Sequence, residues 1–163
     1  SGLEEKGASL DARPVALAPL LAEVLSGYET KARQKGVALG FGAEQGLPDV
    51  VGDSFRLEQL FQNLIDNALK FTDKGRIDVA LRREGNQVAV EVRDTGIGIP
   101  EEHLAHIFER FYVVDKSRDK RLGGTGLGLA IAKHIALRHR GMIDVASRPG
   151  SGTAFTVRLP VAS

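Results

Sequence analysis

The sequence predicts an α/β fold: a two-layer α/β sandwich in which one mixed sheet carries three main helices on one face. Two patterns support this prediction. Residues 87–93 alternate strictly, with Val88, Val90 and Val92 on one side, which indicates a strand with one buried face. Residues 53–71 repeat apolar side chains every three or four positions, which indicates an amphipathic helix with Asp53 or Ser54 as its N-cap. A chain of 163 residues with 42% hydrophobic residues can bury the core of one domain.

The other elements follow from the same two periodicities and from the turn residues between them. The helix after the glycine-rich segment is expected to end at Gly141, acting as a left-handed C′ residue. In chain order we predict an edge strand at 9–14, a helix at 15–35, a strand at 37–42, a hairpin of 77–83 and 87–93 around Glu84-Gly85-Asn86, a short helix at 101–112, a helix from 129, and strands at 142–147 and 153–159 joined by Gly150-Ser151-Gly152.

Composition narrows the function classes. The net charge is +1 and the basic residues are not clustered, so we expect no nucleic-acid partner. There is no cysteine, and no apolar run approaches the roughly 20 residues of a membrane span. We therefore expect no direct membrane contact by this domain and a cytoplasmic location, whether or not the full-length protein is membrane-anchored.

The chain begins with Ser1 and Gly2, which is typical of the scar left by a cleaved expression tag. We therefore expect residues 1–8 to be a tag remnant and linker. Residues 9–163 are then the predicted domain, a piece of a longer protein.

A first motif, residues 63–71, places Asn63, Asn67 and Lys70 at i, i+4 and i+7, on one face of the predicted helix. Mg²⁺ takes oxygen ligands and usually keeps waters and substrate phosphates, so one amide oxygen beside phosphates is a plausible ligand set. Lys70 would meet the same phosphates as a point charge. A solvated outer helix face is the alternative interpretation.

A second motif, residues 94–100, follows the alternating strand directly. Asp94 would accept a hydrogen bond from an exocyclic amine such as that of adenine, whereas the carbonyl of guanine would be repelled. Gly96 and Gly98 allow positive φ and a close approach of the backbone to a flat ligand. An ordinary turn after a strand is the alternative.

A third motif, residues 123–129, contains Gly123, Gly124, Gly126 and Gly128 and leads into a helix. The first N–H groups of a helix have no partner inside it, and together with the helix dipole they favour an anion such as a phosphate. The spacing differs from the Walker and dinucleotide fingerprints.

Together the three motifs resemble the ATP-binding catalytic domain of two-component sensor histidine kinases, with the Bergerat-type fold also found in gyrase, Hsp90 and MutL ATPases. The resemblance implies ATP and Mg²⁺ as cofactors, Asn67 as metal ligand, and Asn63, Asn67 and Lys70 as catalytic residues. In this family Thr153 lies near adenine, although a Thr at the start of a strand is equally expected. The implied nucleotide-binding residues are Asn63, Asn67, Lys70, Asp94, Gly96, Gly98, Ile99, Tyr112, Gly124, Thr125, Gly126, Leu127, Gly128 and Thr153.

Residues 113–122 are expected to form a basic, variable lid that orders around phosphates, because they lack apolar periodicity. The lid follows Phe108 and Phe111, which match the aromatic box of the family. Val113 stands where the family often has an Arg or Lys that touches the terminal phosphate. We expect Lys116 or Arg118 to substitute for that residue.

The resemblance also implies what the chain lacks. None of its four histidines is followed by an acidic residue, as the phosphorylated histidine of sensor kinases is. The acceptor is therefore expected on a separate dimerisation (histidine-phosphotransfer) domain, with a response regulator downstream. Asn63 stands where the ATPase relatives carry a general-base Glu, which favours phosphoryl transfer over hydrolysis. A nucleotide-sensing module without catalysis and an anti-sigma-type serine kinase remain the alternatives.

Overall fold

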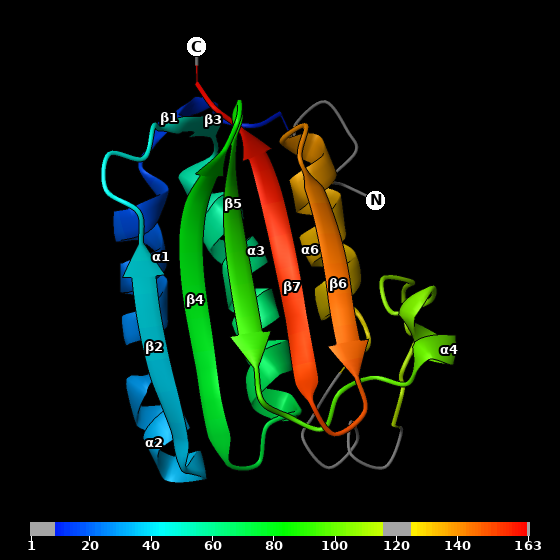
Figure 1. Cartoon of the computed structure of the whole chain (residues 1–163). Helices are drawn as coiled ribbons and strands as arrows, with labels where there is room; N and C mark the ends of the chain where they lie inside the picture. Colours follow the sequence, from blue (N-terminus) through cyan, green and yellow to red (C-terminus); the bar gives the residue numbers. More distant parts are fainter. Residues whose placement is uncertain (1–8, 116–124, 163) are drawn as a thin grey trace.

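A five-stranded mixed sheet forms one layer of the molecule (Figure 1), in the order β2-β4-β5-β7-β6. The computed structural model describes residues 9–115 and 125–162. Strand β2 is parallel to β4, and the other neighbours are antiparallel. The strands are β2 (Val37–Ala43), β4 (Gly75–Glu84), β5 (Gln87–Asp94), β6 (Met142–Arg148) and β7 (Gly152–Pro160).

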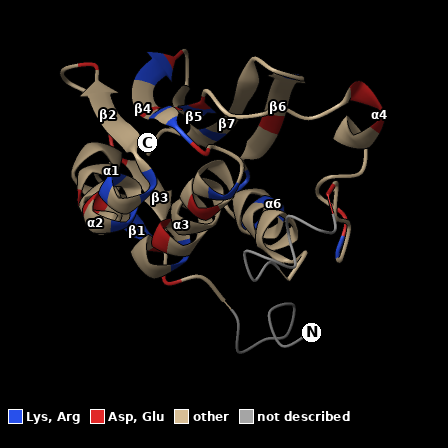
Figure 2. Ribbon diagram, turned by 90° about the horizontal axis from the view of Figure 1, so that it is seen from below, with Lys and Arg blue, Asp and Glu red and all other residues tan. Residues whose placement is uncertain are grey.

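The long helices form a second layer against one face of this sheet (Figures 1 and 2). Helices α3 and α6 pack against each other behind β5, β7 and β6, and α1 and α2 lie behind β2. The core between the layers includes the fully buried Phe61, Leu64 and Phe155. The predicted two-layer α/β sandwich is confirmed. The helices are α1 (Leu17–Ser26), α2 (Glu29–Lys35), α3 (Ser54–Lys70), the short α4 (Glu101–Leu104) beyond β6, and α6 (Gly128–Arg138).

The other face of the sheet carries ion pairs within and between its strands and has no layer of helices against it in the described part of the chain. Arg158 donates to Glu84 at 2.8 Å and to Asp144 at 2.6 Å, and Arg82 pairs with Glu84 at 2.7 Å. These hydrogen bonds lower the pKa of the Glu84 carboxyl from its usual value. Paired charges are stable in contact with water, so this face of the sheet can remain at the surface and the fold has two layers.

The predicted helix 15–35 is wrong in one respect, because it is broken into α1 and α2 at Gly27 and Tyr28. Gly27 N–H and Tyr28 N–H donate to the carbonyls of Val24 and Leu25, closing the last turn of α1. The Tyr28 hydroxyl then donates to the carbonyl of Gln62 on α3 at 3.2 Å. Gly27 is a weak helix former, and Tyr28 is held by its hydrogen bond to α3. The helix therefore breaks here although the apolar pattern continues.

The edge strand predicted at 9–14 is also wrong. The strand is β1 (Arg13–Val15), and it pairs antiparallel with β3 (Val50–Gly52) in a separate two-stranded sheet. Strand β3 was not predicted. Three residues are too few to show an alternating pattern, and pairing with a distant segment decides the structure of both strands.

Only the first four residues of the helix predicted at 101–112 are helical, as α4. The rest of the segment forms successive turns, in which Phe111 has a φ of +66°. The Phe111 N–H donates to the carbonyl of Gly126 at 2.7 Å, which diverts the backbone from a helix.

Helix α6 ends one residue earlier than predicted. Arg140, with φ of +59°, is the left-handed C′ residue, and Gly141 follows it. Arg140 N–H donates to the Leu137 carbonyl and Gly141 N–H to the Ala136 carbonyl, the bonding of a Schellman motif. A Cβ at Gly141 would lie 2.4 Å from the carbonyl oxygen of Arg158, so glycine is required there by close packing and not by its φ.

The buried His139 connects α3 and α6. Its Nδ1 donates to the carbonyl of Ile135 on α6 at 2.9 Å, and its Nε2 accepts from the N–H of Asp53 at 3.0 Å. Asp53 in turn caps α3, as predicted, by accepting from Phe55 and Arg56. The imidazole therefore fixes the C-terminus of α6 against the N-terminus of α3.

Candidate functional site

A cavity of about 500 Å³ lies between α3, the segment after α4 and the start of α6. It brings parts of all three sequence motifs together. The predicted residues in its wall are Asn63, Asn67, Lys70, Ile99, Tyr112, Thr125, Gly126 and Gly128.

Helix α3 contributes the polar wall of this cavity. Asn63, Asn67 and Lys70 are half-buried, while the opposite side of the helix, including Leu60 and Leu64, is fully buried in the core. The Nδ2 atom of Asn63 is buried and has no hydrogen-bond partner within residues 9–115 and 125–162. A buried amide nitrogen without a partner is costly. A ligand that accepts a hydrogen bond at this point would remove the cost.

The start of α6 faces the same helix. A Cβ built on Gly128 would lie 4.0 Å from Cγ of Asn63, so the first residue of α6 is directly opposite the first residue of the first motif. The N-cap of α6 is Leu127, whose side chain cannot cap, and the Leu127 N–H is held by Oγ1 of Thr125 at 3.2 Å. The N–H groups of the first turn of α6 therefore have no side-chain acceptor at the cap.

The second motif is fastened to the end of α3. Ile97 N–H donates to the carbonyl of Phe71 at 3.0 Å, and Gly150 N–H donates to the carbonyl of Ile97 at 2.7 Å. Gly98 has φ of +76°, and a Cβ there would lie 1.9 Å from the Arg148 carbonyl oxygen. A Cβ on Gly96 would lie 2.1 Å from the Phe71 carbonyl oxygen. Both glycines are thus required by the close approach of backbone segments.

Asp94 is 3% exposed at the end of β5. Its Oδ1 accepts from Gly96 N–H at 2.8 Å and from Thr153 N–H at 3.2 Å. Burial raises the pKa of this carboxyl above its usual value, against the opposing effect of the two donated hydrogen bonds. Sequence reasoning placed Asp94 and Thr153 in one site, and the structure brings them into direct contact.

The predicted residues do not all share one surface. The residues outside the described cavity wall are Asp94, Gly96, Gly98, Leu127 and Thr153. Four of them lie at the glycine turn after β5 and at the start of β7, and the fifth, Leu127, is the N-cap of α6. Gly124, together with the lid candidates Lys116 and Arg118 and most of the predicted lid, lies outside the described residues.

Sequence reasoning missed two lysines of α2. Lys31 and Lys35 line the cavity together with Lys70, and the Lys35 ammonium donates to the carbonyl of Leu69 in the last turn of α3. Their only sequence signal is an i, i+4 spacing on a short helix, which is also typical of a solvated face. Asp66 lines the cavity as well. The pKa of Tyr28 is raised mainly by the burial of its hydroxyl and further by the nearby charge of Asp66.

Thr72 was also missed. Its side chain is fully buried, and no residue in the described part of the chain hydrogen-bonds its Oγ1. This hydroxyl lies 2.8 Å from the position of a Cβ on Gly96, directly against the glycine turn of the second motif. A threonine that follows a helix carries no pattern by which a sequence could identify it.

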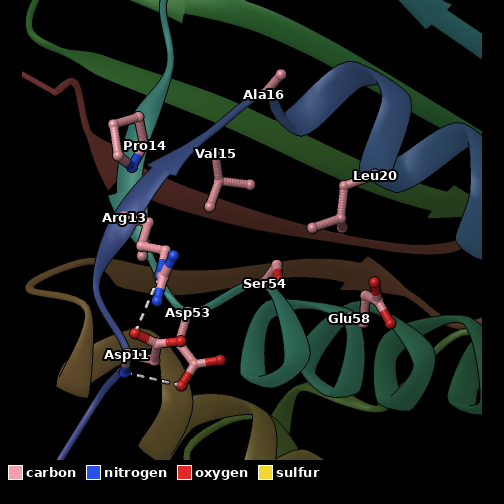
Figure 3. Close-up of a pocket in the computed structure, with 10 residues that line it drawn as sticks. Asp11, Arg13, Pro14, Val15, Ala16, Leu20, Asp53, Ser54 and Glu58 are labelled. Atoms are coloured by element: carbon pink, nitrogen blue, oxygen red, sulfur yellow. Dashed lines mark hydrogen bonds and ion pairs between the residues drawn. The ribbon is translucent and has the colours of Figure 1, made fainter.

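A second cavity, of about 360 Å³, lies at the other end of α3 (Figure 3). Asp53 accepts from Asp11 N–H at 3.1 Å, and Arg13 pairs with Asp11 at 3.1 Å. Arg13 and Asp11 form an exposed ion pair at this cavity, and none of the three motifs reaches it. The candidate site is therefore the cavity between α3 and α6.

Comparison with known proteins identifies the family of the chain. Residues 52–163 match the family described as histidine kinase-, DNA gyrase B-, and HSP90-like ATPase. The match includes all three motifs and the strands from β4 onward. The chain belongs to this ATPase family. None of the helices in the described part of the chain combines the length and apolar character that a membrane crossing needs.

Individual relatives are sensor kinases. The chain is 38% identical to the sensor histidine kinase RppB of Synechocystis over 164 residues and 48% identical to the sensor histidine kinase YkoH of Bacillus subtilis over 109 residues. These alignments cover 100% and 67% of this chain but only 36% and 24% of those relatives. The chain thus spans only about a quarter to a third of the length of these two curated relatives.

Solved structures show the same fold. Full-length ShkA in complex with AMPPNP superposes with a TM-score of 0.86 at 31% identity, over 99% of this chain and 33% of ShkA. The catalytic domain of the histidine kinase ThkA superposes with a TM-score of 0.81 at 29% identity, over 93% of this chain and 96% of that domain. The chain is thus similar in extent to a kinase catalytic domain.

Proposed function

We propose that this domain binds Mg-ATP and donates the γ-phosphoryl group to a histidine on a separate dimerisation domain, in two-component signalling. One observation carries the proposal: the amide face of α3 and the uncapped start of α6 meet on one cavity, with Asp94 buried behind the glycine turn. The relatives that are sensor histidine kinases, and the AMPPNP bound to ShkA, support the choice of nucleotide and reaction.

The phosphates are proposed to lie between α3 and the start of α6. Asn63 faces Gly128 there, and its unpartnered Nδ2 can donate to a phosphate oxygen. The first N–H groups of α6, after Thr125, Gly126 and Leu127, favour an anion in place of a side-chain cap. Gly124 is proposed to belong to the same loop, and Lys70 lines the cavity as the compensating charge.

Magnesium is proposed to bind Asn67. No three His, Cys, Asp or Glu side chains come together as a metal site within the described ranges, so the protein would need phosphate oxygens and water to complete an octahedral shell. The Asn67 amide oxygen in the cavity wall suits that arrangement. Bound there, the ion would neutralise charge on the phosphates during transfer.

The adenine is proposed to lie at the second motif, against Asp94. The hydrogen bonds from Gly96 and Thr153 both go to Oδ1 of Asp94, so Oδ2 can accept a hydrogen bond from an amine. Gly96 and Gly98 hold the backbone close, and Thr153 donates to the same carboxylate. Ile99 and Tyr112, both in the cavity wall, would cover the base with apolar surface.

Transfer rather than hydrolysis follows from Asn63. The ATPase relatives carry a general-base Glu at this position, and an amide cannot accept the proton of an attacking water. Catalysis would then rest on positioning and charge neutralisation by Asn63, Asn67 and Lys70, while the attacking imidazole comes from the partner domain.

The partners follow from the proposed reaction. We infer that residues 9–163 form the catalytic domain, because β1 and α1 pack on the same core as the rest. The acceptor histidine would belong to another part of the full-length protein, and an aspartate of a response regulator would receive the phosphoryl group next. Dependence on ATP favours a cytoplasmic location for this domain.

Nucleotide titration tests the site. The chain is expected to bind Mg-ADP more tightly than Mg-GDP in calorimetry, because Asp94 accepts from an amine and repels a carbonyl. Asp94→Ala should cost about 1.5–3 kcal/mol of ADP binding, the loss of a charged hydrogen bond. Since burial raises the pKa of Asp94, ADP affinity should begin to fall at a higher pH on acidification than an ordinary aspartate would give.

The matched control is Asp78→Ala on the adjacent strand, which removes a carboxylate paired with Arg76 at 2.7 Å outside the site. This variant should bind ADP as the parent does. Equal affinity for ADP and GDP, or unchanged ADP binding by Asp94→Ala, would remove Asp94 from the site.

A further inference from the structure

We propose that His103 and His106 hold the Tyr112 side chain in the wall of the nucleotide cavity, as positioning residues for nucleotide binding. This inference rests on the proposed function, because Tyr112 is expected to cover the bound base. It adds two residues that none of the three motifs contains.

His103 contacts Tyr112 directly. Its Nδ1 forms a hydrogen bond with the Tyr112 hydroxyl, and the two ring centroids lie 5.7 Å apart at an interplanar angle of 57°. Both side chains are half-buried. A phenol has one torsion that turns the ring about its axis and another that swings it, and a hydrogen bond at the far end of the ring restricts the swing.

His106 stacks on the same ring. The His106 and Tyr112 rings are stacked, with centroids 5.3 Å apart and an interplanar angle of 25°. His106 is itself held by Glu109, to which its Nδ1 donates at 2.7 Å. The phenol thus contacts one imidazole at its hydroxyl and another at its face.

The backbone explains why these residues meet. The N–H groups of His106, Glu109 and Tyr112 donate to the carbonyls three residues earlier, of His103, His106 and Glu109. Successive turns of this kind place every third side chain on one side of the segment. The positive φ of Phe111 then changes the direction of the chain just before Tyr112, so the Tyr112 side chain can reach both histidines.

The glycine loop fixes the backbone immediately before Tyr112. Phe111, immediately before it, is held at φ of +66° by its 2.7 Å hydrogen bond to the Gly126 carbonyl. Gly126 has φ of +74°, and a Cβ there would lie 2.8 Å from Cα of Phe111. A strained non-glycine residue persists where its surroundings over-determine the backbone, and such residues cluster at binding sites.

A side chain already held in place loses little freedom when a ligand arrives. The two imidazoles therefore raise nucleotide affinity by pre-organising Tyr112, without touching the nucleotide themselves. A purely structural role would instead lower stability and leave the affinity of the folded chain unchanged.

Calorimetric titration with Mg-ADP tests the proposal. His103→Ala is expected to weaken binding roughly three- to tenfold, the effect of one hydrogen bond. His103→Asn keeps a polar atom near the position of Nδ1 and should restore most of the loss. Glu102→Ala, an exposed neighbour on α4, is the matched control and should bind as the parent does.

A double-mutant cycle separates positioning from other effects. In a Tyr112→Phe background the hydroxyl is absent, so His103→Ala should cost almost nothing further. An equal loss in both backgrounds, or no loss in the parent background, would overturn the proposal.

The contact is also tested without nucleotide. The chain has two tyrosines, Tyr28 and Tyr112, so tyrosine labelled with ¹³C at Cζ should give two NMR signals, which Tyr28→Phe assigns. His103→Ala should shift the Tyr112 signal, and an unchanged signal would contradict the contact. A parent chain that fails to bind Mg-ADP would overturn the proposed function itself, whereas normal binding with unchanged affinity in the His103 variants would overturn the positioning role alone.

Discussion

Asn67→Ala is expected to abolish the magnesium-dependent part of ATP affinity and nearly all phosphoryl transfer. Asn67 lies in the cavity wall on the amide face of α3, and alanine has no oxygen to offer the ion. Titration of ATP with and without Mg²⁺ measures the first effect, and transfer in the full-length protein measures the second. The parent chain should bind ATP more tightly with Mg²⁺, and the variant should bind it equally with and without the metal.

The matched control is Gln59→Ala on the same helix. Gln59 is half-buried but does not line the cavity, and alanine favours the helix at both positions. The control should retain both magnesium dependence and transfer. Loss of folding in both variants, or full activity in both, would mean that this helix face serves the fold and not the ligand.

Gly98→Ala is expected to have the second large effect, on both the fold and the site. Gly98 has φ of +76°, and the added Cβ would lie 1.9 Å from the Arg148 carbonyl oxygen, so the turn after Asp94 would have to move. We expect the free energy of unfolding to fall by about 2–4 kcal/mol, from backbone strain plus the clash. Urea unfolding followed by circular dichroism measures this change, and ADP titration of the remaining folded protein should show weakened binding.

Gly42→Ala provides the comparison for Gly98→Ala. Gly42 lies on the edge strand β2, does not have positive φ, and has open space where its Cβ would be. This substitution should change the free energy of unfolding by less than about 1 kcal/mol. Equal stability of the Gly98 and Gly42 variants would contradict the role given to the glycine turn.

Much of this fold could be predicted because the elements that dominate it are long and periodic. Helix α3 combines an apolar stripe with a capping Asp53, and β5 carries a buried valine at every second position from Val88 to Val92, so local sequence and tertiary burial favour the same structure. The relation of Asn63, Asn67 and Lys70 to one another followed from helix geometry alone.

The elements that could not be predicted depend on distant contacts. β3 exists through pairing with β1, and the break at Gly27 and Tyr28 is stabilised by the Tyr28 bond to Gln62. Phe111 leaves the helical region because Gly126, in another motif, holds its N–H. Such contacts leave no local period in the sequence.

Some residues of the site could not be predicted for the same reason. The spacing of His103, His106 and Tyr112 suggests nothing in an α-helix and gains meaning only once the segment folds as successive turns. Lys31 and Lys35 reach the cavity only because α2 packs beside the end of α3.

The central claim, that this domain transfers phosphoryl groups to a histidine outside itself, is tested most directly with radiolabelled ATP. The isolated chain and the full-length protein that contains it would be incubated with Mg²⁺ and γ-labelled ATP, and both protein-bound label and free phosphate would be followed. We predict that the isolated chain neither labels itself nor releases phosphate appreciably, while the full-length protein acquires acid-labile phosphohistidine on its dimerisation domain. Rapid ATP hydrolysis by the isolated chain, stable label on any of its own histidines, or acid-stable phosphoserine on a protein substrate would contradict the assignment.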